Sequence, residues 1–292
     1  MLAMALPPPL GNMMTAPDRA PKDADLHFDR APLVERVLAV QFDPLKGLTN
    51  AHLGWFWKGF LSPQWVKATT AALLPDQREV FEADAHWQRP GVTLSVRLGE
   101  DPVRLQVTHE NDDRVLQLQP TRFLYNWRRR QGSYPKHDAL LQEFQEHLQG
   151  LRKFVDESGV GPLRLNQWEV TYVNHLPRGE GWESPADWAK VLPKLLGPGQ
   201  VGGDLQIESF SGEWHFEIEP RAARLHVAVQ HGRLLTAEGP EVLVLQLTAR
   251  GPIREEPGWG LQDGIDRGHR ACRTAFAEMT PPALHALWGR TR

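Results

Sequence analysis

The chain holds a single cysteine, Cys272, among its 292 residues. One cysteine cannot make an internal disulfide, and it cannot supply a cysteine-rich zinc module. No apolar run approaches the roughly 20 residues that a membrane-spanning helix needs, so we expect no membrane partner. Neither charge is in excess, with 33 Lys and Arg against 36 Asp and Glu, which argues against a surface built wholly for nucleic acid.

Catalytic signatures are missing as well. The chain has no His-Glu-x-x-His, no Gly-x-Ser-x-Gly and no Walker loop. Residues 197–202 match the dinucleotide-binding pattern literally, but they follow a predicted helix and include Pro198, so we interpret them as a linker. We expect no cofactor, and the sequence leaves open whether the protein is an enzyme while favouring that it is not.

What is present is typical of a folded protein, with 41% hydrophobic and 24% charged residues. Residues 1–31 are the exception. They contain Pro7, Pro8, Pro9, Pro17 and Pro21 and no sustained hydrophobic period, which predicts a disordered tail. The first residues lack the basic start and uninterrupted apolar stretch of a secretory signal, so we expect a cytoplasmic protein.

From residue 32 onward, the periodicity predicts two halves, residues 32–160 and 161–292, with the same order of elements. We expect helices over residues 50–61 and 140–155, alternating strands at 94–98, 103–107 and 116–118, and a second-half helix that opens at Ser184-Pro185. The prediction is an α+β fold: two pseudo-repeated β-α-β-β-β-α halves form one unit, with antiparallel sheet and helices on one face. Coincidence stays open as the alternative, because such patterns are common.

Three clusters of residues carry a resemblance to a known family. The first is Pro32-Leu33-Val34-Glu35 leading to Val40-Gln41-Phe42. The second comprises Arg122-Phe123, Asn126-Trp127-Arg128, Tyr134-Pro135 and the run from Glu169 to His175, and the third comprises Asp266, His269, Phe276, Thr280 and Trp288-Gly289. Together they resemble a family of sporadically distributed bacterial and archaeal proteins of about this length, which has no established biochemical function. The resemblance implies one full-length module, supplies no reaction, and points to accessory roles such as defence, toxin neutralisation or mobile-element biology.

Seven residues of these clusters are our candidate binding residues: Asn126, Trp127, Arg128, Tyr134, Tyr172, Asn174 and His269. Asn126 and Asn174 are expected at the ends of strands, where they could form a paired ligand site at the junction of the halves or simply satisfy the turning backbone. The arginines at 128–130 beside an exposed Trp127 could bind phosphates and stack a base, or could form a basic loop beside a locally packed ring. Most of the eleven tryptophans are expected in the core.

Two further sets of residues could carry chemistry. Glu213, His215, Glu217 and Glu219 alternate with apolar residues, which predicts all four on one strand face. They could hold a divalent metal or share a proton, although a solvated sheet face is the reading that we favour. His269 and Cys272 could pair as base and nucleophile, but their apolar stripe favours a buried cysteine beside a buried histidine.

If helices cover one sheet face, the other face is expected to be open and polar. The residues expected there are Arg97, Arg104, Gln106, Thr108, Gln117, Gln119, Glu213, His215, Glu217, Glu219, Arg224, His226 and Gln230. Such a face is a platform for a partner, so we interpret the protein as a non-enzymatic binding or regulatory module with a protein partner. Two alternatives stay open: a metal-assisted hydrolase or nuclease that uses the acidic row, and nucleic-acid binding through residues 128–130.

Overall fold

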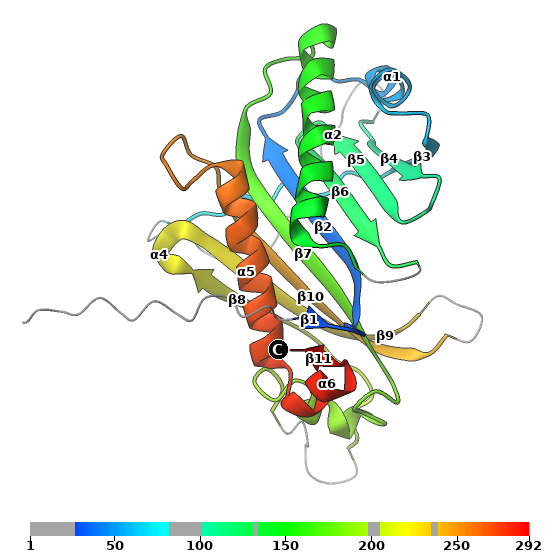
Figure 1. Ribbon diagram of the computed structural model, residues 1–292, viewed down its shortest axis with the longest axis vertical. Coiled ribbons are helices and arrows are strands. Elements are labelled where there is room, and N and C mark those ends of the chain that lie inside the picture. The colour runs from blue at the N-terminus through cyan, green and yellow to red at the C-terminus, as the bar shows by residue number, and fades with distance from the viewer. Residues whose placement is uncertain (1–26, 82–100, 131–133, 198–204, 235–238, 292) are drawn as a thin grey trace, which may run out of the picture.

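The computed structural model describes residues 27–81, 101–130, 134–197, 205–234 and 239–291. The strands of its large sheet are β2 (Leu33–Phe42), β3 (Trp65–Ala71), β4 (Arg104–His109), β5 (Arg114–Gln119), β6 (Arg122–Arg128), β7 (Leu165–Pro177), β8 (Ser211–Ile218), β9 (Ala223–Arg233) and β10 (Glu241–Pro252). They form one nine-stranded sheet in the order β3-β4-β5-β6-β2-β7-β10-β9-β8, and all neighbours are antiparallel (Figure 1). The predicted α+β class with antiparallel sheet is confirmed.

Three long helices, α1 (Asn50–Phe60), α2 (His137–Ser158) and α5 (Leu261–Met279), lie on one face of this sheet (Figure 1). Short helical segments complete the described chain: η1 (Pro185–Asp187), α3 (Trp188–Val191), α4 (Glu219–Ala222) and α6 (Pro282–Leu287). The buried stripe of α2 is the apolar stripe that the periodicity predicts, from Leu140 to Val155. The helix ends at Gly159, whose φ of 63° is a left-handed conformation that glycine adopts without a steric penalty.

Helix α5 packs unusually close to β7, and glycines make this possible. A Cβ atom built on Gly264 would lie 2.2 Å from Cδ1 of Trp168, and one on Gly268 would lie 2.7 Å from Cζ3 of the same ring. Trp168 is 1% exposed, so the indole fills the space that side chains at these two positions would otherwise occupy. The face of α5 that holds Gly264 and Gly268 therefore lies directly against the central strand β7.

One strand and one helix differ from the prediction. Strand β3 was not expected, and it lies at one edge of the sheet, beside β4. The helix expected after Ser184-Pro185 is only the 3₁₀ turn η1 followed by the four residues of α3. The predicted strand over residues 94–98 lies outside the described residues.

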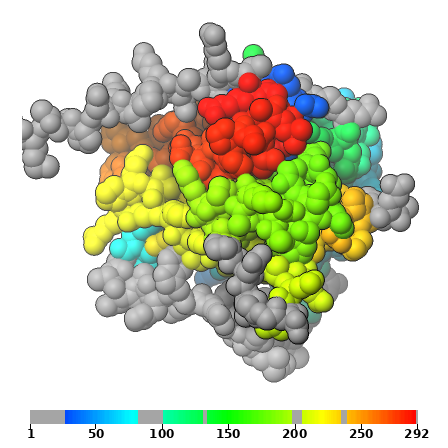
Figure 2. All heavy atoms as spheres, turned by 90° about the horizontal axis from the view of Figure 1, so that it is seen from below, coloured from blue at the N-terminus to red at the C-terminus, as the bar shows by residue number. Residues whose placement is uncertain are grey.

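The two chain ends of the described region meet. The short strand β1 (His27–Phe28) pairs antiparallel with β11 (Arg290–Thr291), and Figure 2 shows the C-terminal residues in red beside the start of the chain in blue. Phe28 is buried and its ring contacts those of Phe276 and Trp288. The boundary expected at residue 31 is therefore wrong: the folded part includes residues 27–31, while residues 1–26 lie outside the described chain. None of the helices described here is long and apolar enough to cross a membrane.

Candidate functional site

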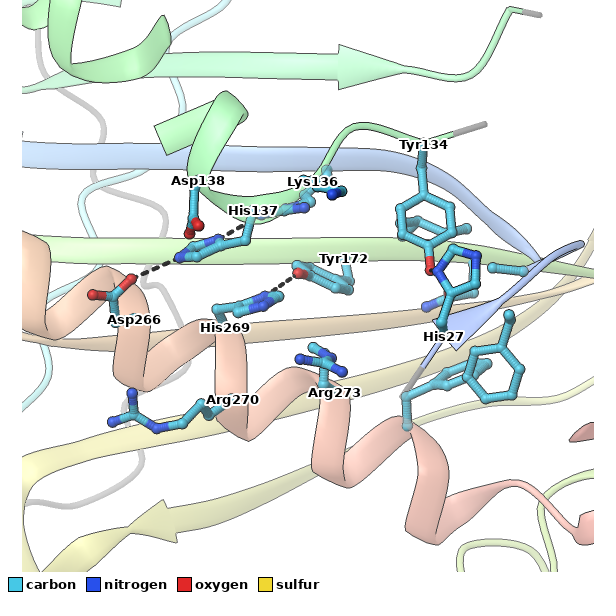
Figure 3. A pocket seen from close by; sticks show the side chains of 16 residues that line it. His27, Tyr134, Lys136, His137, Asp138, Tyr172, Asp266, His269, Arg270 and Arg273 are labelled. Carbon is cyan, nitrogen blue, oxygen red and sulfur yellow. Dashed lines mark hydrogen bonds and ion pairs between the residues drawn. The ribbon is translucent and has the colours of Figure 1, made fainter. Parts of the chain in front are cut away.

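A cavity of about 690 Å³ lies at the middle of the helical face of the sheet. Its walls come from β1, from β2 and β7, from the segment that leads into α2, and from α5. Figure 3 shows His137 and His269 at one end of this cavity, and Tyr134 and His27 side by side at the other. The cavity is therefore built by residues from both halves of the chain and by its first described strand.

Arg36, His137 and Asp266 form a hydrogen-bonded chain in the wall of the cavity. Nη2 of Arg36 lies 2.6 Å from Nδ1 of His137, and Nε2 of His137 lies 2.7 Å from Oδ1 of Asp266. A guanidinium can only donate, so Nδ1 accepts from Arg36 and Nε2–H donates to Asp266. Burial, the largest effect, and the charge of Arg36 lower the pKa of His137 although Asp266 opposes them. This imidazole is neutral and both of its nitrogens are occupied.

A second histidine is stacked on the first. The rings of His137 and His269 have centroids 3.9 Å apart and planes within 3° of parallel, and Nδ1 of His269 is hydrogen-bonded to the hydroxyl of Tyr172. Burial, the largest effect, and the charges of the neighbouring His137, Arg36, Arg273 and Arg270 together lower the pKa of His269 to about 2. Burial also raises the pKa of Tyr172 to about 12. Both residues are therefore uncharged at neutral pH.

Arg36 is the exceptional charge of the site. Its residue is 2% exposed, and its hydrogen bonds go to the neutral His137 and to the carbonyl oxygen of Pro135. The guanidinium lies 5.3 Å from the ring centroid of Tyr172, and its Nε has no hydrogen-bond partner. Among the described residues no carboxylate forms an ion pair with it, although a buried charge is normally paired with an opposite one.

Other charges around the cavity leave it positive. Lys136, Arg270 and Arg273 line it together with Arg36, whereas Asp138 and Asp266 are its carboxylates. Asp266 is already engaged by His137. The first residue of the 22-residue helix α2 also lines the cavity, so the positive end of that helix dipole lies at the same place. The site as a whole favours an anion.

Four of the seven predicted binding residues come together here: Tyr134, Tyr172, Asn174 and His269 all line the cavity. The other three do not line it. Asn126 is buried within β6 and bonds Glu35 and Gln117, and Arg128 pairs with Glu35 at 2.9 Å. Asn126 and Asn174 both lie inside strands, so the expectation that they end them is wrong.

The basic run at residues 128–130 does not offer the stacking surface expected of it. Trp127 is 3% exposed and packs in the core, so its ring cannot stack on a base from solvent. Arg128 pairs with Glu35, and Arg130 pairs with Asp112 at 2.7 Å. Two of the three arginines therefore already have carboxylate partners within the chain. These contacts agree with the second alternative, a basic segment beside a locally packed tryptophan.

The acidic row also differs from its prediction. Glu213, His215 and Glu217 alternate along β8, but Glu219 lies beyond the strand and pairs with Arg267 at 3.3 Å. Nδ1 of His215 lies 2.8 Å from Nδ1 of His226 on the neighbouring strand β9. Within the described ranges, no group of three or more His, Cys, Asp or Glu side chains is placed to hold a metal ion.

The sheet face opposite the helices is not the open platform that we expected. Residues 73–81, which we call the strap, cross it, and three glutamines of the sheet bond the backbone of the strap. Gln119 donates to the carbonyl oxygen of Leu74 and accepts from its N–H, Gln167 does the same with Gln77 and Glu79, and Gln41 donates to Gln77. The chain itself thus occupies the centre of this face.

Glu79 anchors the strap in a cluster of cations. Its side chain is 5% exposed and contacts Arg224, His226 at 2.6 Å and Arg250 at 3.2 Å. Burial acts to raise the pKa of the Glu79 carboxyl, but the hydrogen bonds and charges of these three residues lower it overall. The polar character of this face is therefore explained, at its centre, by contacts within the protein.

Cys272 belongs to the core, as expected from its stripe. It is fully buried, and its Sγ lies 3.9 Å from the carbonyl oxygen of Val170 and 3.8 Å from that of Leu247. Burial raises the pKa of the thiol to about 12. The neighbouring His269 bonds Tyr172 instead of the thiol, so the two do not form a nucleophile and base.

Sequence reasoning missed the two residues that organise the cavity, Arg36 and His137. One signal was available for Arg36, because it is a charged residue within the strongly apolar run of β2, at a position where the strand is buried on both faces. His137 lies in the first turn of a helix and carries no such signal. No protein-family model, curated protein or solved structure matches the chain, so the geometry of this cavity carries the functional argument.

Proposed function

We propose that this protein is a binding module and that the cavity between α2, α5 and the centre of the sheet holds an anionic ligand. The observation that carries the proposal is the guanidinium of Arg36, which is 2% exposed and has only neutral hydrogen-bond partners among the described residues. Burying a cation without a partner lowers the free energy of unfolding by roughly several kcal/mol, because the charge loses its hydration. A bound anion compensates for this loss. The ligand therefore completes the site.

The shape of the site supports a small ligand. Its volume, about 690 Å³, falls within the range of roughly 300–1,000 Å³ that is typical of small-molecule pockets. Two further cations, Lys136 and Arg270, and the N-terminus of α2 reinforce the field of Arg36. Charge-assisted hydrogen bonds from arginine to an oxyanion contribute more than neutral ones, which favours a phosphate or carboxylate group.

Binding accounts for the histidines better than catalysis does. Both nitrogens of His137 are engaged, by Arg36 and by Asp266, and His269 is neutral and bonded to Tyr172. A general base works best with a pKa near the working pH, and a pKa of about 2 makes the imidazole of His269 a weak base. The two imidazoles serve instead to orient Arg36 and Tyr172 in the wall.

The test is thermal denaturation of the full chain in rising concentrations of inorganic phosphate and of citrate, at constant ionic strength. A ligand that binds only the folded state stabilises it by RT ln(1 + [L]/Kd), so the midpoint rises with the concentration and the affinity of the ligand. We expect the midpoint of the wild-type protein to rise and that of Arg36→Met to stay constant. The matched control is Arg130→Met, which removes an arginine outside the cavity and should respond like the wild type. An equal rise in Arg36→Met would overturn the proposal.

We also propose that the two halves of the chain are pseudo-repeats, and that the chain belongs with the sporadic prokaryotic family that it resembles. Supporting the first point, β2 pairs with β6, the last strand of its half, and β7 pairs with β10, the last of its own. Strands β2 and β7 pair antiparallel at the centre. Equivalent helices, α2 and α5, then supply the two stacked histidines, so the binding site lies on the junction of the halves.

A further inference from the structure

Resting on the proposed function, we infer that the ligand is a small phosphate monoester with an aromatic group, the chemistry shared by aryl phosphates and nucleoside monophosphates. The cavity offers two different environments to such a molecule. One end carries the stacked imidazoles with Lys136 and Arg270 near them, and the other end carries the rings of Tyr134 and His27 (Figure 3). A ligand with a compact charged group on one side and a flat apolar group on the other matches both.

The charged end suits two negative charges. Arg270 and Arg273 line the cavity from the same helix as His269, and Arg36 lines it from β2. Lys136 lies on the opposite wall, next to His137 (Figure 3). Arg273 apart, the described lining residues hold three cations against two carboxylates, and the N-terminus of α2 adds roughly half a positive charge. A monocarboxylate would leave part of this positive charge uncompensated. A phosphate monoester carries a charge of about −1.5 to −2 at neutral pH.

The other end suits a ring. Among the described lining residues, four rings belong to this end: those of His27, Phe28, Tyr134 and Phe276. Phe28 and Phe276 meet edge to face with centroids 5.8 Å apart, and Tyr134 bonds His27 beside them. Offset and edge-on contacts with such rings add to the affinity of an aromatic ligand beyond its buried area. Inorganic phosphate alone would leave this end of the cavity empty.

The experiment is isothermal titration calorimetry of the full chain with phenyl phosphate, inorganic phosphate and benzoate at one pH and ionic strength. We expect phenyl phosphate to bind about tenfold or more tightly than either of the others, since inorganic phosphate lacks the ring and benzoate carries a single negative charge. Arg270→Met removes an exposed cation from the rim and should weaken phenyl phosphate about tenfold and the singly charged benzoate by less. Tyr134→Leu removes a ring and should weaken phenyl phosphate about threefold to tenfold while leaving inorganic phosphate unchanged.

The possible failures are distinguishable. Equal affinities for phenyl phosphate and inorganic phosphate, both lost in Arg36→Met, would overturn the aromatic group and leave the anion site intact. Equal affinities for phenyl phosphate and benzoate would overturn the phosphate. Tighter binding of a single-stranded oligonucleotide than of adenosine monophosphate, lost in Arg36→Met, would overturn the small molecule in favour of a polymer end. No binding of any probe would overturn this inference and the proposed function together.

Discussion

The imidazoles of His137 and His269 lie face to face, 3.9 Å apart and parallel within 3°. This stack joins the first residue of α2 to the middle of α5, two helices from different halves of the chain. Through it, Asp266 and Arg36 are tied to one imidazole and Tyr172 to the other. The position of the buried guanidinium therefore depends on how the two helices pack on the sheet.

The burial of His269 makes the free energy of unfolding dependent on pH. His269 has a pKa of about 2 in the folded chain against an ordinary value of 6.5, so between these values the unfolded chain binds one more proton. Stability is thus fully present above pH 6.5 and falls as the pH drops below it, by about 1.4 kcal/mol per pH unit for this residue. We predict that the free energy of unfolding falls by about 2 kcal/mol less in His269→Phe than in the wild type when the pH is lowered from 7 to 5. Urea unfolding at both pH values measures this difference.

The control for this prediction is Tyr172→Phe. It removes the hydrogen bond to Nδ1 of His269 but keeps the burial that is the largest cause of the lowered pKa. The pH dependence of this variant should stay close to that of the wild type. Identical slopes for wild type and His269→Phe would contradict the account of a buried, neutral imidazole.

Two glycines make a matched pair for the packing of α5. At Gly264 a methyl group would collide with Trp168, so Gly264→Ala should lower the free energy of unfolding by about 1–3 kcal/mol. At Gly54, in the middle of α1, an added Cβ meets no atom within 4 Å. Gly54→Ala should therefore raise the free energy of unfolding by about 0.5–1 kcal/mol. Denaturant unfolding measures both. Equal effects of the same sign would show that α5 does not press on Trp168.

The strap depends on Glu79. Glu79→Gln removes the negative charge that Arg224, His226 and Arg250 share in a buried place, so we expect a loss of about 3 kcal/mol in unfolding free energy. Glu256→Gln is the control, since that carboxylate is exposed and lies 3.9 Å from Arg254, and it should change stability by less than about 0.5 kcal/mol. A stable Glu79→Gln protein would mean that the strap is held by its glutamine contacts alone.

Cys272 should be chemically silent in the folded protein. Its pKa of about 12 and its complete burial keep the thiol protonated and out of reach of reagents. Ellman's reagent should react with one thiol per chain in urea and with a negligible fraction in native buffer over an hour. Rapid native reaction would show that the helix α5 opens or that the thiol is activated.

The parts of the fold with a strong hydrophobic period were predictable, and the stripe of α2 is the clearest case. Strand β3 was missed because an edge strand buries few of its side chains, so Val66, Lys67 and Thr69 are exposed and carry little alternation. The strap was missed for a different reason. It has no regular structure, and only the tertiary fold shows that Gln119 and Gln167 bind its backbone.

The candidate site was predicted in part. The family resemblance singled out Tyr172, Asn174 and His269 together with Tyr134, and the fold brings these four to one cavity. Arg36 was missed because a single arginine within the apolar run of β2 forms no spaced motif with other polar residues. Arg36 indicates an anion site because its hydrogen-bond partners in the folded structure are neutral. The spacing of residues in the sequence does not reveal which partners a buried side chain has.

The most direct test of the central claim is anomalous diffraction from crystals of the full chain soaked in tungstate, a tetrahedral dianion. The account predicts an anomalous peak inside the cavity, roughly 4 Å from a guanidinium nitrogen of Arg36, because an oxygen of tungstate accepts the charge-assisted hydrogen bond and the tungsten atom lies one bond beyond it. Crystals of Arg36→Met should lack this peak. Tungstate at surface arginines with none in the cavity, or a cavity peak that persists in Arg36→Met, would contradict it.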